Sequence, residues 1–170
     1  MPPMTAADFC DRNARKFGEK EALVDHRRRL TWRQVKELSD RLALGLLNLG
    51  LKRDAKILAQ LPNWAELFLL RLACEKAGLR LVTVTPSFRS AELAPIVRFT
   101  RPEAAIIPGN YRGCDYYGLL QSVRNPELKQ IIVAGEVVAG ALSLEELLAR
   151  PPRGKASSAD LDKSRYTILD

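Results

Sequence analysis

The chain has 170 residues, 46% of them hydrophobic and 28% charged, which is enough apolar material for the core of one globular domain. This composition excludes a disordered or fibrous protein. The net charge of +7 would suit nucleic acid or another anionic partner, but the basic residues are scattered and form a cluster only at positions 26–29.

The cysteines at positions 10, 74 and 114 lie far apart, and the chain has a single histidine, so the residues for a structural zinc site are lacking. Sparse, odd-numbered cysteines indicate reduced thiols. No apolar run is long enough for a membrane-spanning helix, and the first residues lack the basic and apolar parts of a secretion signal. We therefore expect a cytoplasmic protein without a membrane span.

The first expected element is a short surface helix that Thr5 caps. A small hairpin follows, with strands at 22–25 and 29–31, and its turn holds the basic cluster, whose charges we expect to be solvated. Thr31 and Gln34 have the spacing of a capping box and predict the start of an amphipathic helix.

The middle of the chain carries a regular alternation of short apolar segments and longer helical patterns. The apolar segments lie at 57–61, 81–85, 104–107 and 131–134. Each intervening stretch is long enough for a crossover helix. This βαβ spacing predicts an α/β fold, in which a mostly parallel, twisted sheet carries helices on both faces.

The helix expected at 64–77 is apolar almost all round, so most of its surface should be buried. We expect Asn63 to cap this helix. We also expect Trp64 and Leu67 to be core residues rather than ligand contacts.

Pro, Gly and Ser are frequent at 151–158, a composition typical of linkers. We therefore place one compact domain at residues 1–150 and a linker at 151–170. Residues 166–169 would suit the start of a further strand.

Prolines and short polar residues follow the expected strands, at 62–63, 86–87, 108–110 and 135–136. In open parallel sheets, ligands bind beyond the carboxyl ends of the strands. Turn chemistry alone also accounts for these residues. Two interpretations therefore stay open, structural turns or the wall of a ligand site.

Other patterns that suggest chemistry are incomplete. Residues 113–118 have the glycine spacing of a phosphate-binding loop, but leucines replace the Lys and the Ser or Thr that hold phosphate and Mg²⁺. His26 lies in the basic turn, without the sheltered setting of a catalytic histidine. The adjacent Glu145 and Glu146 point in different directions on a helix and are not a paired acid and base.

Four segments in strict order carry a resemblance to a known family: LTWRQV, LALGLLNLGL, ILAQLPNWAELFLLRLACEKAGL and VTVTPSFRSAEL. Together they resemble the N-terminal region of the acyl-adenylate-forming enzymes, the AMP-dependent synthetase and ligase superfamily that includes acyl- and aryl-CoA ligases. The resemblance is densest at 30–93 and extends to 107. The shared motifs are structural rather than catalytic.

The resemblance implies that the chain is the N-terminal subdomain of a larger ATP-dependent acid–CoA ligase. Such a parent would use ATP and Mg²⁺ to convert a small carboxylic acid into an acyl-AMP and would then pass the acyl group to CoA. The family's phosphate loop, nucleotide contacts and catalytic lysine match no position here and would follow residue 170. We therefore expect the chain to hold no cofactor alone, to be inactive alone, and to have the remainder of its own chain as partner. The family's acid pocket is built mainly after the phosphate loop, so the sequence does not indicate the acid.

One binding residue is implied by the resemblance. In some CoA ligases of this family, a basic residue in the loop after the second strand approaches the CoA phosphates. The position directly after Pro86 is Ser87, which is not basic, so Arg89 is the nearest candidate for the CoA phosphate contact.

Two alternatives to the ligase interpretation stay open. One is a stand-alone basic module that contacts nucleic acid or an anionic protein. The other is a degenerate homologue with a structural role. Because the basic residues are spread along the chain with no stacking platform beside the 27–29 cluster, we expect no sequence-specific binding to nucleic acid.

Overall fold

The computed structural model describes residues 4–136, 138–149 and 156–167. The described residues divide into two compact units, each assembled from separate stretches of sequence. Unit 1 takes its residues from 1–53, 63–79 and 147–170, and unit 2 takes its residues from 54–62 and 80–146. The sequence had suggested one compact body at 1–150. Because the two units alternate along the chain, no change in composition marks a boundary between them.

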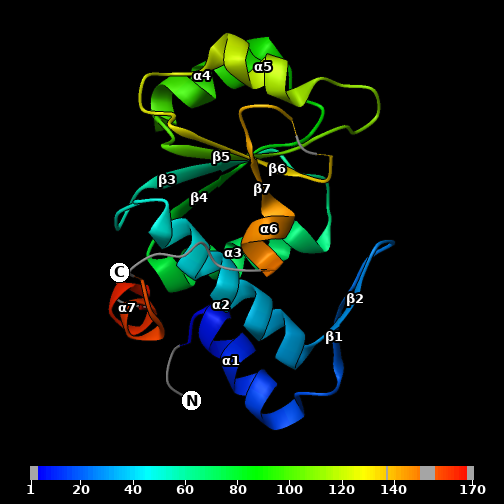
Figure 1. The fold of residues 1–170 in the computed structure, drawn as a ribbon, viewed down its shortest axis with the longest axis vertical. Helices are drawn as coiled ribbons and strands as arrows, with labels where there is room; N and C mark the ends of the chain where they lie inside the picture. The colour runs from blue at the N-terminus through cyan, green and yellow to red at the C-terminus, as the bar shows by residue number, and fades with distance from the viewer. Residues whose placement is uncertain (1–3, 137, 150–155, 168–170) are drawn as a thin grey trace. The chain divides into compact units, whose positions relative to one another are not determined.

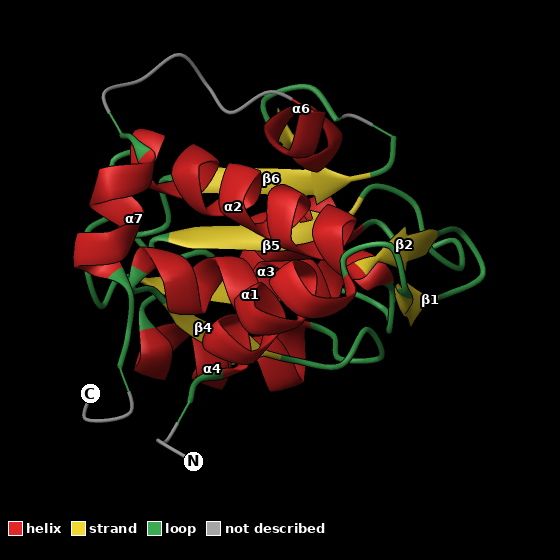
Figure 2. Ribbon diagram, turned by 90° about the horizontal axis from the view of Figure 1, so that it is seen from below, coloured by secondary structure: helices red, strands yellow, loops and turns green. Residues whose placement is uncertain are grey.

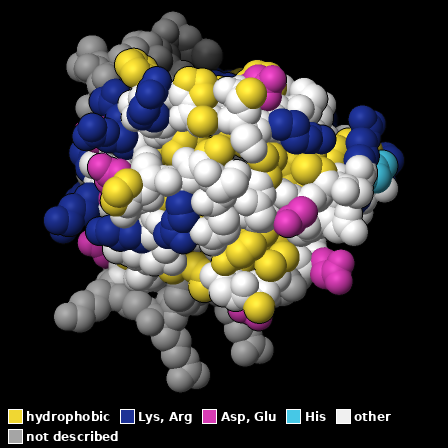
Figure 3. All heavy atoms as spheres, turned by 90° about the horizontal axis from the view of Figure 1, so that it is seen from above, with side chains coloured by type: hydrophobic (Ala, Val, Ile, Leu, Met, Phe, Trp, Pro, Cys, Tyr) yellow, Lys and Arg dark blue, Asp and Glu magenta, His cyan; other side chains and the backbone are white. Residues whose placement is uncertain are grey.

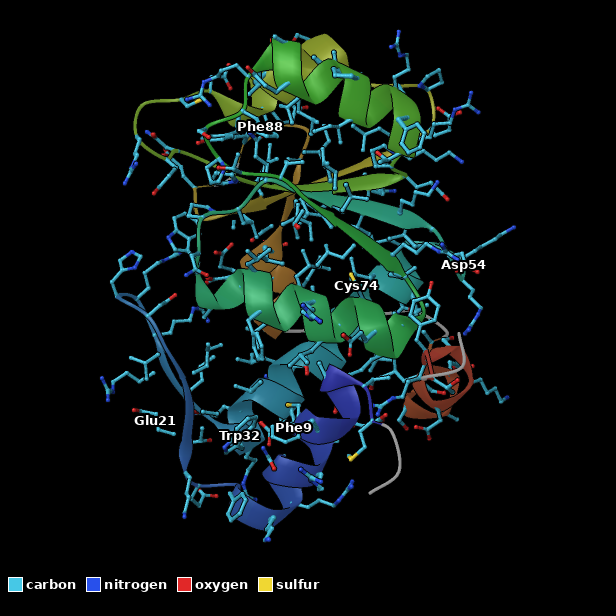
Figure 4. The ribbon with its side chains drawn as sticks, turned by 180° about the vertical axis from the view of Figure 1, so that it is seen from behind. Phe9, Glu21, Trp32, Asp54, Cys74 and Phe88 are labelled. Atoms are coloured by element: carbon cyan, nitrogen blue, oxygen red, sulfur yellow. The ribbon has the colours of Figure 1, made fainter. Side chains whose placement is uncertain are left out.

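Unit 1 contains most of the helices and the hairpin (Figure 1). The predicted hairpin is present as two antiparallel strands, and the capping boxes at Thr5 and Thr31 are both formed. At the first helices, the rings of Phe9 and Trp32 meet edge to face with centroids 6.0 Å apart (Figure 4). The elements of unit 1 are α1 (Ala6–Phe17), β1 (Glu21–Val24), β2 (Arg29–Thr31), α2 (Trp32–Asn48), α3 (Ala65–Ala77) and α7 (Ser158–Ser164).

Unit 2 is built on a five-stranded sheet whose order is β4-β3-β5-β6-β7, with every neighbouring pair parallel. Figure 2 shows β4, β5 and β6 of this sheet. All four strands predicted from the sequence are present, with ends shifted by at most two residues. The α/β class and the parallel sheet are therefore confirmed. The elements are β3 (Lys56–Ala59), β4 (Arg80–Thr83), α4 (Ser90–Thr100), β5 (Ala104–Pro108), α5 (Tyr116–Val123), β6 (Gln130–Ala134) and β7 (Leu142–Ser143). The next helix, α6 (Leu144–Ala149), has its first residues in unit 2 and its last residues in unit 1.

The core of unit 2 lies between the sheet and helices α4 and α5, which cover one face of it (Figure 1). Every residue of β5 is buried, as expected for a central strand of a parallel sheet. The buried cluster on the side of α4 and α5 comprises Leu58, Val97, Ala105, Ile107, Tyr116, Leu120, Leu128, Ile131 and Val133.

The buried residues of helix α3 differ from those that the sequence predicted. Trp64 and Leu67 are only half-buried, and the buried leucines are Leu69, Leu70 and Leu72. The prediction was wrong because a helix that is apolar all round has no periodicity that identifies its buried face.

Among the described residues, no helix combines the length and the hydropathy that a bilayer span requires.

The cap of α3 comes from the hairpin turn and not from Asn63, which is exposed. Asp25 Oδ2 accepts a hydrogen bond of 2.7 Å from the backbone N–H of Ala65. Asp25 Oδ1 accepts from the backbone N–H groups of Arg27 and Arg28, each at 2.7 Å. One carboxylate thus closes the turn and caps a helix 40 residues further along the chain.

The basic turn is accordingly not a simple solvated loop. Arg28 Nε lies 2.9 Å from Glu66 Oε1, and the Glu66 side chain is fully buried. The guanidinium of Arg27 lies over the Trp64 ring, 4.4 Å from its centroid. A buried carboxylate needs a cation nearby, and the turn supplies it.

Replacing Asp25 by alanine should lower the free energy of unfolding by about 1–2 kcal/mol, because the cap of α3 and the turn hydrogen bonds are lost together. Urea unfolding measures the change. The neighbouring His26→Ala at an exposed position is the control and should change it by less than about 0.5 kcal/mol. Equal effects of the two substitutions would contradict the capping role.

The stretch predicted as a linker contains helix α7, which packs against α2 and α3. Arg165, directly after it, donates from Nη1 to Asp8 Oδ1 at 2.8 Å and from Nη2 to Asp11 Oδ2 at 2.7 Å. Residues 156–167 are therefore part of unit 1 rather than a free connection. Residues 166 and 167 are not in a strand, and positions 150–155 and 168–170 lie outside the described residues.

The ion pairs of Asp11 predict a loss of stability in acid. Burial alone would raise the pKa of Asp11, but the hydrogen bond from Arg165 and the charge of Lys76 hold the pKa below its ordinary value of 3.8. Since the pKa is lower in the folded state, this stabilisation is present above about pH 4 and is lost as the pH falls through the folded-state pKa. Urea unfolding between pH 7 and pH 2.5 should show this loss. In Asp11→Asn, the free energy of unfolding should fall less steeply over the acid part of this range, called here the acid limb. An unchanged acid limb in the variant would contradict the assignment.

Candidate functional site

The loops that follow the strands of unit 2 meet at the carboxyl edge of its sheet. Because all the strands are parallel, the loops after β3, β4, β5 and β6 leave from the same edge. The chain passes from β3 to β4 on one side and then returns to β5 on the other. Such a reversal of strand order is where open α/β sheets bind ligands, so this edge is the candidate functional site.

The loop of residues 85–89, between β4 and α4, is held through its backbone carbonyls; Figure 4 marks it by Phe88. Gln60, at the end of β3, is fully buried and donates from Nε2 to Thr85 O at 3.3 Å and to Phe88 O at 3.0 Å. Tyr116, the first residue of α5, is also buried and donates its hydroxyl to Pro86 O at 3.0 Å. Side chains from two other elements thus fix the loop.

Arg89, the predicted phosphate contact, lies in this loop and is exposed. Its backbone N–H donates to Glu92 Oε2 at 2.9 Å at the start of α4. Its side chain folds back over the loop, where Nη1 donates to Pro86 O at 2.8 Å and to Phe88 O at 2.9 Å. The guanidinium carbon lies 6.0 Å from the centroid of the Tyr116 ring. Arg89 is therefore placed at the carboxyl edge, with one nitrogen committed to the loop.

A hollow of about 330 Å³ lies at the same edge, beside the loops after β5 and β6. The two loops touch there, because a Cβ at Gly109 would overlap the backbone carbonyl of Glu136. Asp115 is occupied as the cap of α5, where its Oδ1 accepts from Gly118 N at 2.8 Å. No Lys or Arg lines the hollow, so its described lining does not favour a phosphate. The lining residues are Gly109, Asn110, Gly113, Cys114, Asp115 and Glu136.

Cys10 and Cys74 are buried and do not have the properties of reactive thiols. Burial raises the pKa of the Cys10 thiol to about 11 and also raises the pKa of the Cys74 thiol, so both stay protonated at neutral pH. No group of three or more His, Cys, Asp or Glu residues within 4–136, 138–149 and 156–167 is arranged to hold a metal ion.

Glu145 and Glu146, and the tyrosines near the hollow, have structural roles. Glu145 Oε1 accepts from the backbone N–H of Gly135 at 2.9 Å, so this carboxylate is engaged in holding the loop after β6. The backbone N–H of Glu146 donates to Ser143 Oγ at 3.2 Å, as expected at the start of a helix. Tyr111 and Tyr117 pack against the core cluster of unit 2. They therefore do not form an exposed platform for stacking a base.

In Figure 3, most of the Lys and Arg side chains lie along the left of the view and others lie at the upper right, with mainly uncharged groups between them. A second hollow of about 430 Å³ includes Arg98, Arg101 and Arg124 in its lining, together with Glu127. None of its lining residues is aromatic. Recognition of single-stranded nucleic acid usually combines cations with stacking side chains, so this hollow lacks half of that pattern.

Comparison with known proteins defines the family. The sequence model described as AMP-binding enzyme matches residues 10–165, and the chain belongs to this family. It is 36% identical over 149 residues to the 2,3-dihydroxybenzoate-AMP ligase of Bacillus subtilis, an alignment that covers 86% of this chain and 28% of that protein. It is 31% identical over 162 residues to the mitochondrial medium-chain acyl-CoA ligase ACSF2 of Rattus norvegicus, covering 85% of this chain and 26% of that protein.

Solved structures show the same fold. The anthranilate CoA ligase AuaEII, in complex with anthranoyl-AMP, matches with a TM-score of 0.78 at 24% identity, over 91% of this chain and 30% of that chain. The apo structure of Mycobacterium smegmatis MbtA matches with a TM-score of 0.74 at 27% identity, over 89% of this chain and 28% of that one. The chain spans 26–28% of the length of the two curated relatives named above.

Proposed function

We propose that this chain is the N-terminal part of a longer ATP-dependent ligase, which activates a small carboxylic acid as its acyl-adenylate and then transfers the acyl group to CoA. The family match over residues 10–165 carries this proposal. The named relatives are acid–AMP and acyl-CoA ligases, and this chain corresponds to about a quarter of each. The remainder of the chain and the carboxylic acid are the partners in this proposal.

ATP and Mg²⁺ do not fit the residues described here. The 113–118 glycine pair lies at the start of α5, where Asp115 and not a phosphate occupies the backbone N–H of Gly118. We therefore assign nucleotide and metal binding to the part of the protein beyond this chain, and we expect the chain alone to be inactive.

Arg89 is the residue through which this chain would contact CoA. Arg89 Nη1 donates to the loop carbonyls, and Nε and Nη2 would be the donors to a phosphate oxygen. A guanidinium makes strong, directional, charge-assisted hydrogen bonds to phosphate. Arg89 would thus bind and orient a CoA phosphate without taking part in the transfer of the acyl group.

No observation favours the alternative of a basic binding module. Several of the basic residues are neutralised within the chain, as in the pairs Arg28–Glu66, Arg33–Glu19 and Arg80–Asp54. The proposal includes a cytoplasmic location, which the free thiols of all three cysteines support. One of the relatives is described as mitochondrial, and localisation of a tagged protein would decide between the compartments.

Acid-dependent exchange of pyrophosphate into ATP tests whether adenylation needs the part of the protein beyond this chain. The purified 170-residue chain should give no exchange above background with any carboxylic acid, because it lacks the groups that hold phosphate and metal. The full-length ligase from Bacillus subtilis with 2,3-dihydroxybenzoate is the positive control. Exchange by the chain alone would contradict the proposal and require an ATP site within it.

A further inference from the structure

The loop of residues 85–89 has an unusual number of side chains directed at its backbone. The carbonyl oxygens of Thr85, Pro86 and Phe88 all accept side-chain hydrogen bonds, from Gln60, Tyr116 or Arg89. The carbonyls of Pro86 and Phe88 each accept two. Hydrogen bonds from three side chains therefore fix the shape of this loop.

Gln60 makes these contacts at the cost of an unpaired acceptor. Its side chain is completely buried, and Oε1 has no hydrogen-bond partner in the described part of the chain. Burying an unpaired amide oxygen is unfavourable, and a leucine of similar size would avoid that cost. A leucine would, however, lack the Nε2 donor that binds both Thr85 O and Phe88 O.

Arg89 shares an acceptor with each of the other two residues. Phe88 O accepts from both Gln60 Nε2 and Arg89 Nη1, and Pro86 O accepts from both Tyr116 and Arg89 Nη1. The direction of the guanidinium therefore depends on two carbonyls whose positions Gln60 and Tyr116 fix. A cation held in one direction before its ligand arrives loses less conformational entropy on binding.

We propose that Gln60 and Tyr116 are positioning residues that fix the 85–89 loop and so set the direction in which Arg89 presents its guanidinium to a phosphate group. This inference rests on the proposed function, in which that phosphate belongs to CoA. Gln60 and Tyr116 act through Arg89 and do not touch the phosphate themselves.

The test is a titration of the 170-residue chain with adenosine 3′,5′-bisphosphate, which carries phosphates of the kind found at the nucleotide end of CoA, followed by NMR. Arg89→Gln should weaken binding about tenfold or more, the usual scale for losing a hydrogen bond to a charged group. Gln60→Leu and Tyr116→Phe should each weaken it by about threefold or more, as expected for coupled neighbours. The matched control is Gln121→Leu, on the same unit, where the side chain contacts Arg124 and not the loop; its binding should be unchanged.

Double variants separate positioning from a general structural role. If Gln60 acts through Arg89, Gln60→Leu should weaken binding no further in a chain that already carries Arg89→Gln. Additive losses, or a Gln60→Leu chain that binds like the Gln121→Leu control, would overturn the inference. Tyr116→Phe removes one hydroxyl only, so it keeps the test decisive if Gln60→Leu does not fold.

A chain that does not bind the bisphosphate at all would refute the phosphate role of Arg89, which belongs to the proposed function. The positioning claim is then decided by the Arg89 Nε–H resonance and by amide exchange at residues 87–89. Gln60→Leu should shift the resonance and speed the exchange, whereas Gln121→Leu should do neither. Identical spectra and exchange rates in the two variants would overturn the positioning claim.

Discussion

Replacing Lys76 by alanine is expected to lower the free energy of unfolding by about 3–5 kcal/mol, the range for breaking a buried ion pair by removing one partner. The Lys76 side chain is completely buried within unit 1. Its Nζ lies 2.6 Å from Asp40 Oδ1, 2.9 Å from Asp11 Oδ1 and 2.9 Å from Ser39 Oγ. The substitution would leave both carboxylates without this cation in a poorly solvated place.

The matched control is Arg71→Ala on the same helix. Arg71 pairs with Glu75 at 3.5 Å, but its side chain is 64% exposed, so its loss should cost less than about 1 kcal/mol. Urea unfolding at pH 7 measures both. A Lys76→Ala chain as stable as the Arg71→Ala chain would show that Lys76 is solvated and that the buried network is not formed.

The second large effect is expected at Gly78, where alanine should cost about 2–4 kcal/mol. Gly78 ends α3 with a φ of 65°, a conformation that L residues adopt at a cost. A Cβ there would also overlap the backbone carbonyl of Ser164 at the end of α7. Strain and overlap therefore add at one position.

Gly50 separates these two contributions. Its φ is 83°, but a Cβ there would meet nothing within 4 Å, so Gly50→Ala should show the strain alone, about 1 kcal/mol. Thermal or urea unfolding compares the two variants. Equal losses would mean that Ser164 yields without cost and that α7 is not firmly packed against the end of α3.

The parts of the fold that the sequence predicted correctly are those with a local cause. The strand segments, the hairpin, the cap at Thr5 and the capping box of Thr31 with Gln34 are each indicated by residues a few positions apart. The contacts that the sequence did not predict join distant positions. Asp25 caps α3 at Ala65, and Lys76 pairs with Asp11, and neither partner carries a local pattern that identifies the other.

The candidate site shows the same division. Arg89 was identified because the resemblance places a basic residue shortly after Pro86, and the structure does place it at the carboxyl edge of the sheet; its phosphate contact stays a proposal. Gln60 was missed, although the sequence carries a signal: it is the one polar residue in the otherwise apolar segment 57–61. Only the fold shows that its side chain reaches a loop 25 residues away.

The central claim is that this chain supplies the N-terminal part of an acid-activating ligase. The most direct measurement is acid-dependent pyrophosphate exchange by a chimera, in which this chain replaces the aligned part of the Bacillus subtilis 2,3-dihydroxybenzoate-AMP ligase, 28% of that protein. The account predicts exchange with 2,3-dihydroxybenzoate by the chimera and none by either piece alone. A chimera that folds, as shown by a cooperative unfolding transition, yet gives no exchange would contradict the claim.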